Sequence, residues 1–217
     1  MSLIRSIRTI FPEFQETNTL PEGISNVTTS KDATLSSWSW EGPKVRRARL
    51  CKLEVPGKFF AETLVIYPKF GYDAPILGTE YLRIGDKKYF GATDFHPLSQ
   101  DKEYLDRYVS EYLYDFPDRE EGESKFYDFT TFFSQKFWLR KSGEDFYNEY
   151  IDWADRYLSR YRLCLEEMES SFDSEKLQSA YDTHMAVNDP AHGILKAYFS
   201  KELADTYTNE FLFSLSR

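Results

Sequence analysis

The first half of the chain alternates polar and apolar residues in short runs, a pattern typical of β-strands. The runs cover 36–40, 45–53, 59–67, 76–84 and 88–95, and the side chains of a strand point alternately to its two faces. Turn-forming residues separate the runs, most clearly at Pro56-Gly57 and Gly85-Asp86. Because a parallel crossover needs a dozen residues or more, connections this short predict antiparallel neighbours.

The second half of the chain has the periodicity of helices, most clearly over 144–170. Residues that recur there at the i, i+3, i+4, i+7 spacing of one helix face are Tyr147, Tyr150, Ile151, Ala154, Tyr157, Leu158, Tyr161 and Leu165. Further helices are expected over 101–116, in part of 127–140, and over 174–187, 191–199 and 201–213. Strands followed by helices predict an α+β fold with an antiparallel sheet covered by helices. No repeat or linker divides the 217 residues, so we expect a single domain over 1–217.

Composition excludes several classes of function. A net charge of −9 argues against general nucleic-acid binding. Cys51 and Cys164 are far apart and predict free thiols in a reducing compartment, and the three histidines form no metal-binding pattern, so no bound metal is expected. The sequence has no membrane span and no secretory signal, which favours a cytoplasmic protein. Eighteen Phe and sixteen Tyr suit either a thick core or the walls of a pocket for a flat ligand.

Two aspartates are candidates for proton chemistry, and each has a structural alternative. Asp94 shares one side of a predicted strand with Phe90, Ala92 and His96. A carboxyl group among apolar neighbours has a raised pKa and can act as a general acid; alternatively, Asp94 bonds the turn that follows. Asp189 precedes a proline, so it either caps the next helix or serves as a second acid.

A basic stretch runs from Lys44 to Lys58 in this otherwise acidic chain. Its positive residues, against the single acid Glu54, are Lys44, Arg46, Arg47, Arg49, Lys52 and Lys58. Such a stretch either steers an acidic partner to the protein or protects a solvated strand edge with charge.

Six segments together resemble the ferredoxin-dependent bilin reductases. They are LPEG (20–23), SSWSWEGPKVRRARL (36–50), IYPKFGYDAPILGTEYLRIG (66–85), DFHPLSQDKEYLDRY (94–108), LQSAYDTHMAVNDPAHGIL (177–195) and NEFLF (209–213). The segments keep the family's order over nearly the whole chain. The Trp38-Ser39-Trp40 motif and DKEYLDRY favour the branch that reduces biliverdin IXα to 15,16-dihydrobiliverdin.

The resemblance implies an α/β/α sandwich, with a central antiparallel sheet flanked by helices on both faces and the bilin held between the sheet and the C-terminal helices. It implies that Asp94 and Asp189 donate protons. We expect His96 to contact the substrate. Because arginine suits the two bilin carboxylates, Arg140 is the first candidate to anchor them, with Ser134 and Lys196 nearby; a solvated helix end is the alternative for Arg140.

The implied reaction is a two-electron reduction of the C15=C16 bridge by a radical mechanism, the first step of phycoerythrobilin synthesis. No cofactor is expected in the protein, and reduced [2Fe–2S] ferredoxin supplies the electrons, docking at Lys44, Arg46, Arg47 and Arg49. The alternatives are a four-electron phycoerythrobilin synthase, a reductase of another double bond, or a bilin carrier. We expect a monomer that passes its product to a second reductase, in a cyanobacterium, a phage-infected host cell or a plastid stroma.

Overall fold

A single antiparallel sheet forms the centre of the protein in our computed structural model, which describes residues 2–17, 20–119, 131–168, 173–189 and 191–216. The strands lie in the order β1-β3-β4-β5-β6-β7-β8, and β2 pairs with β3. Their bounds are β1 (Gln15–Glu16), β2 (Asn26–Thr28), β3 (Thr34–Glu41), β4 (Val45–Val55), β5 (Phe59–Pro68), β6 (Ile76–Ile84), β7 (Lys88–His96) and β8 (Trp138–Ser142). The five strands predicted from the sequence are confirmed as β3 to β7, each paired with the next along the chain.

Tight turns set this order of strands. Gly57 lies in the middle of the turn between β4 and β5 with φ of +69°, and Gly85 turns β6 into β7 with φ of +58°. Glycine adopts such angles without the steric cost that a Cβ atom imposes. The resulting hairpins place β5, β6 and β7 side by side in the sheet, so that their side chains on one face form a continuous surface.

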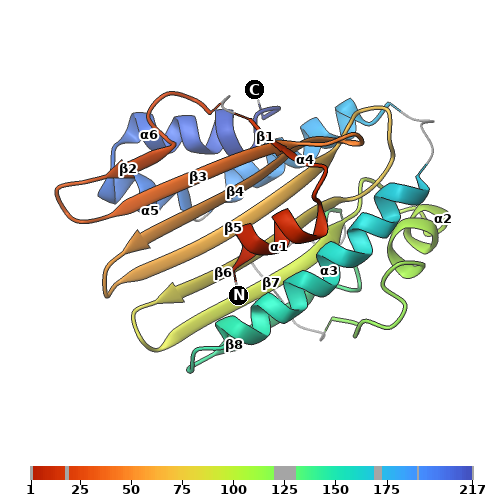
Figure 1. The fold of residues 1–217 in the computed structure, drawn as a ribbon, viewed down its shortest axis with the longest axis horizontal. Coiled ribbons are helices and arrows are strands. Elements are labelled where there is room, and N and C mark those ends of the chain that lie inside the picture. Colours follow the sequence, from red (N-terminus) through yellow and green to blue (C-terminus); the bar gives the residue numbers. More distant parts are fainter. Residues whose placement is uncertain (1, 18–19, 120–130, 169–172, 190, 217) are drawn as a thin grey trace.

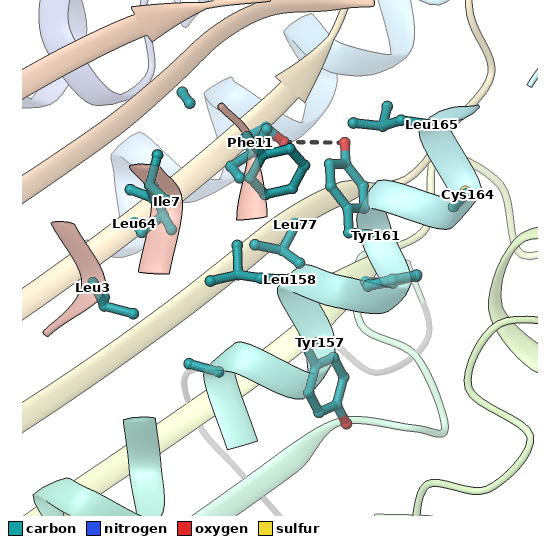
Figure 2. Close-up of a cluster of buried hydrophobic side chains, with 14 of the residues drawn as sticks. Leu3, Ile7, Phe11, Leu64, Leu77, Tyr157, Leu158, Tyr161, Cys164 and Leu165 are labelled. Carbon is teal, nitrogen blue, oxygen red and sulfur yellow. Dashed lines mark hydrogen bonds between the residues drawn. The ribbon is translucent and has the colours of Figure 1, made fainter. Parts of the chain in front are cut away.

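One face of the sheet is covered by α1 (Leu3–Ile10) and α3 (Tyr147–Glu167), which cross it in Figure 1. Figure 2 shows Leu3 and Ile7 of α1 and Leu158 of α3 among the side chains around Leu64 and Leu77 of the sheet. All five side chains are fully buried, and burying one such aliphatic side chain stabilises the fold by roughly 1.5–3 kcal/mol. The helix face predicted from the spacing in 144–170 is therefore confirmed as the core-facing side of α3.

The opposite face of the sheet is covered by the C-terminal helices (Figure 1). These are α4 (Glu175–Asn188), α5 (Ala191–Tyr198), α6 (Lys201–Thr206) and the π-helical turn η2 (Tyr207–Leu212). Leu195 and Phe211 from this layer pack in one buried cluster with Leu53 and Val65 of the sheet. Helices thus lie on both faces, which confirms the α/β/α sandwich.

Two of the predicted helices differ in the structure. The helix expected over 101–116 is limited to α2 (Lys102–Leu105) and the π-helical turn η1 (Asp106–Ser110). The helix expected in part of 127–140 is wrong for residues 131–140, which form turns followed by the start of β8; residues 127–130 lie outside the described part of the chain. Strand β8 pairs with the free edge of β7, and this tertiary pairing outweighs the local pattern.

Candidate active site

A cavity of about 370 Å³ lies between the sheet and the C-terminal layer. Strands β5, β6 and β7 form its floor. One wall comes from β8 and the segment before it. The remaining walls come from the end of α4, the start of α5, and η2 with Phe213 after it. Most of the lining is apolar or aromatic, including Val65, Leu82, Phe90, Phe137, Met185 and Phe213. A slot with such walls suits a flat, largely apolar ligand.

Two carboxyl groups, Glu80 and Asp189, line this apolar cavity. Glu80 projects from β6, and its Oε1 accepts a hydrogen bond of 3.2 Å from Oγ1 of Thr63 on β5. Asp189 follows α4, and its Oδ1 accepts a hydrogen bond of 2.8 Å from the backbone N–H of Ala191. Its Oδ2 is buried and has no hydrogen-bond partner among the described residues. Asp189 therefore accepts a hydrogen bond from the start of α5, as expected for a residue that caps this helix. Its second oxygen remains available to a ligand.

Burial gives both carboxyl groups an elevated pKa. It raises the pKa of Glu80 to about 7, and the negative charge of Asp189 adds to this effect. It raises the pKa of Asp189 to about 6, against the opposing effect of the Ala191 N–H. Because two neighbouring carboxylates repel each other in an apolar site, their titrations are coupled. Near neutral pH such groups can hold and release protons toward a ligand in the cavity.

Asp94 lies on the same face of β7 as Phe90 and Ala92 but does not line the cavity. Its side chain is completely buried, and both oxygens are engaged by Ser134. The backbone N–H of Ser134 lies 2.8 Å from Oδ2, and Oγ of Ser134 lies 2.5 Å from Oδ1. Burial raises the pKa of Asp94 to about 8, so a protonated carboxyl is favoured at neutral pH. In this arrangement Asp94 fixes the segment before β8, and neither Asp94 nor Ser134 is among the residues that line the cavity.

His96 lines the cavity, as expected for a residue in contact with substrate. Its Nδ1 lies 2.6 Å from the hydroxyl oxygen of Tyr181, and its ring packs against Phe133 at 4.8 Å between centroids. The ring also covers Gly78, where a Cβ atom would come within 2.5 Å of the imidazole. Burial lowers the pKa of His96 to about 3, which keeps the imidazole neutral.

Arg140 lies on the opposite face of the sheet from the cavity. It pairs in register with Gly91, forms an ion pair with Glu149 of α3 and stacks on Phe146 at 4.8 Å. The structure does not place Arg140 at this cavity, because alternation along β8 turns it toward α3 and turns the next residue, Lys141, into the cavity. Lys196 is exposed on α5 and does not line the cavity either.

The basic residues expected to dock ferredoxin are largely engaged within the protein. Arg47 is buried, forms an ion pair of 2.7 Å with Asp182 of α4 and donates a hydrogen bond to Ser214. Arg46 donates to Gln178, Arg49 donates to the backbone oxygen of Glu210, and Lys44 donates to the backbone oxygen of Met168. Arg47 is therefore too buried to present its charge to a partner, and the half-buried Arg46 and Arg49 tie β4 to the C-terminal layer.

Glu80 was not singled out in the sequence, although a signal was present. It lies in the predicted strand 76–84, where every second residue faces the same side. Glu80 shares its side with the nonpolar residues Gly78, Leu82 and Ile84, so it is the acid in an otherwise nonpolar row. The same reasoning selected Asp94, and the register places both acids on one face of the sheet: Glu80 pairs with Ala92 and Asp94 pairs with Gly78. Of the two, Glu80 lines the cavity.

Other kinds of site find no support in the described part of the chain. No group of three or more His, Cys, Asp or Glu side chains there is arranged to hold a metal ion. None of the described helices has the length and apolar character that a membrane crossing requires.

Comparisons with known proteins agree with this fold. The chain is 32% identical to a 15,16-dihydrobiliverdin:ferredoxin oxidoreductase of Parasynechococcus marenigrum, over 91% of this chain and 90% of the relative. It is 34% identical to the protein of the same name from Prochlorococcus marinus, over 84% and 82% of the two chains. The crystal structure of phytochromobilin synthase from tomato in complex with biliverdin superposes with a TM-score of 0.81 at 20% identity, covering 99% of this chain and 82% of that one.

The sequence profile of the ferredoxin-dependent bilin reductases matches residues 5–214, almost the full length of the chain. The relatives above 30% identity agree with this match. The chain belongs to the ferredoxin-dependent bilin reductase family and is a ferredoxin-dependent oxidoreductase acting on a bilin.

Proposed function

We propose that this protein reduces biliverdin IXα at the C15=C16 bridge to 15,16-dihydrobiliverdin, the first step of phycoerythrobilin synthesis. The relatives that carry the name of this reaction support the choice of bond. The observation that carries the proposal is the pair Glu80 and Asp189, two carboxyl groups with raised pKa values in one apolar slot. A protein that only carried a bilin would have no need for such acids.

The cavity supplies what the bilin requires from a protein. Aromatic and aliphatic walls exclude water from a conjugated tetrapyrrole, and the carboxyl groups can accept hydrogen bonds from its pyrrole N–H groups. His96, held neutral against Tyr181, adds a polar contact to the same floor. The protein's contribution is therefore to hold the bilin flat and to place protons beside it.

The reaction balances with two electrons and two protons. Ferredoxin delivers its electrons singly, so the bilin passes through a one-electron-reduced radical. The C15=C16 double bond becomes a single bond, and each of its carbons gains one hydrogen. We assign the donation of these protons to Glu80 and Asp189, and a supporting role to Asp94, whose oxygens are held by Ser134.

The test is an anaerobic incubation of the protein with biliverdin and a reduced [2Fe–2S] ferredoxin, followed by chromatography of the bilins. The expected product is 15,16-dihydrobiliverdin, with an absorbance shift to shorter wavelength during the reaction. Phycoerythrobilin as the end product would instead identify a four-electron enzyme. Unchanged biliverdin that stays bound to the protein would identify a carrier.

A further inference from the structure

The mouth of the cavity carries two lysines on its sheet side. Lys141 of β8 lines the cavity and pairs in register with Phe90 of β7, which lines it too. Lys88 lies two residues before Phe90, so alternation places it on the same face of β7. Diagonal neighbours on adjacent antiparallel strands have Cα atoms about 7–8 Å apart. Ile84, which pairs with Lys88 and also lines the cavity, is 51% exposed, so this end of the slot opens to solvent.

Neither lysine has an ion-pair or hydrogen-bond partner in the part of the chain that the structure describes. Arg140, adjacent to Lys141 but on the other face, is in contrast paired with Glu149. Among the described residues that line the cavity, Lys141 is the one lysine or arginine. The cavity mouth therefore has positive charge that no described residue compensates.

The interior of the cavity has the opposite character. Glu80 lies four residues before the exposed Ile84 on β6, and Asp189 lies close enough to affect its charge, so a ligand carboxylate there would meet like charge. Two strand spacings and two residues along the strands separate Glu80 from Lys141, which places their Cα atoms roughly 12 Å apart. A ligand with N–H groups on one side and carboxylates on the other matches this polarity.

We propose that Lys141 and Lys88 bind the two carboxylate side chains of the bilin at the cavity mouth and so fix which edge of the tetrapyrrole faces solvent. This inference rests on the proposed function, since it assumes a bilin in the cavity. The lysines replace Arg140 and Lys196 as the carboxylate-binding residues, and they orient the ring so that its nitrogens face the acids.

The experiment compares two probes, biliverdin and biliverdin dimethyl ester, in which the carboxylates are masked. Equilibrium titrations followed by bilin absorbance are done with the wild type, Lys141→Gln, Lys88→Gln and the double variant. Each single change should weaken biliverdin binding about two- to fivefold, as for an exposed charge pair, and the loss should shrink at high salt. Binding of the dimethyl ester should stay the same in all four proteins.

Arg140→Gln is the matched control, because it removes a cation from the adjacent residue on the opposite face. It should bind both probes like the wild type. An unchanged biliverdin affinity in the double variant, or an equal loss for both probes, would overturn the assignment of the lysines. If the wild type binds neither probe, the proposed function itself fails, which separates the two claims.

Discussion

Three carboxyl groups near the cavity share a raised pKa but differ in their surroundings: Asp94 is buried, whereas Glu80 and Asp189 are half-buried. Burial raises the pKa of Glu80 to about 7, of Asp189 to about 6 and of Asp94 to about 8. Glu80 and Asp189 line the cavity, whereas both oxygens of Asp94 contact Ser134. A raised pKa alone therefore does not identify a proton donor; the carboxyl group must also reach the ligand.

We predict that Glu80→Gln lowers turnover by about 100-fold or more while biliverdin still binds, because the amide keeps the shape but cannot supply a proton. Single-turnover absorbance with reduced ferredoxin would measure the rate, and titration would measure binding. A bilin radical should persist longer in this variant. Asp94→Asn is the control: its amide oxygen can accept from the Ser134 N–H and its NH₂ can donate to Oγ, so turnover should be largely kept. An equal loss of turnover in the two variants would show that Asp94 also donates a proton in the reaction.

The pKa of Asp94 also predicts how stability changes with pH in the ligand-free protein. Its ordinary pKa of 3.8 rises to about 8 on folding, so the folded protein binds this proton more tightly than the unfolded chain does. Its contribution to the free energy of unfolding is full below pH 4 and is lost as pH rises toward 8, by at most about 1.4 kcal/mol per pH unit. Asp94→Asn has no proton to lose. In urea unfolding at pH 5, 6.5 and 8, the free energy of unfolding of the variant should rise relative to that of the wild type as the pH increases. A constant difference between the two proteins over this pH range would contradict the prediction.

At the scale of elements, strands β3 to β7 could be predicted because their signals are local. Alternation and turn residues such as Gly57 and Gly85 lie within the hairpins that they define. Strand β8 could not, because residues 138–142 become a strand only by pairing with β7. That error also reversed the direction of Arg140: on a helix it could face the ligand, whereas on β8 it faces α3.

The candidate site was predictable only in part, for the same reason. Asp189 was assigned its role through the family resemblance, and His96 shares the strand face of Asp94; both line the cavity. Glu80 and Lys141 were missed, since their position depends on the register of strands that are distant in sequence. The basic stretch of β4 was misread because the partners of Arg46 and Arg47 come from α4, more than a hundred residues later.

The buried ion pair between β4 and α4 gives a prediction at the scale of elements. Asp182 accepts hydrogen bonds from Arg47 and from the backbone N–H of Leu215, so removing the arginine leaves a buried carboxylate short of partners. Arg47→Met should lower the free energy of unfolding by about 3–5 kcal/mol. Arg8→Met, which breaks the exposed pair with Glu16, should cost less than about 1 kcal/mol. Urea unfolding of both variants measures the difference.

The same pair changes what charge reversal on β4 would do. Replacing Arg46 and Arg47 with glutamate would place acids beside Asp182, so we expect loss of folded protein rather than slower docking of ferredoxin. Turnover of that double variant should fall equally at low and high ionic strength. A loss confined to low ionic strength, in a protein with a normal unfolding midpoint, would instead favour docking at β4.

At the scale of the whole molecule, the two helical layers have different tasks. The layer of α1 and α3 packs on the sheet in a core of buried side chains. The layer of α4 to η2 packs on the sheet over part of its area and encloses the cavity over the rest. A ligand therefore contributes packing to one layer only. Ligand binding and folding of the C-terminal layer should be linked.

This linkage can be measured with biliverdin alone. At a concentration one hundred times its dissociation constant, biliverdin should stabilise the folded protein by about 2.7 kcal/mol and raise the melting temperature by about 5–10 °C. Hydrogen exchange should slow in α4, α5 and η2 and stay unchanged in α3, which serves as the internal control. Uniform slowing over both layers, or slowing in α3 alone, would place the ligand outside the cavity.

The order of the elements along the chain matters while the protein is being made. All strands of the sheet lie before residue 143, but the helices that cover the cavity face come from residues 175–212. A nascent chain can therefore close its hairpins while Leu53 and Val65, later buried under that layer, still face water. Bare apolar sheet surface promotes aggregation of partly folded chains. We therefore expect an interval of biosynthesis in which this face of the sheet is accessible to chaperones.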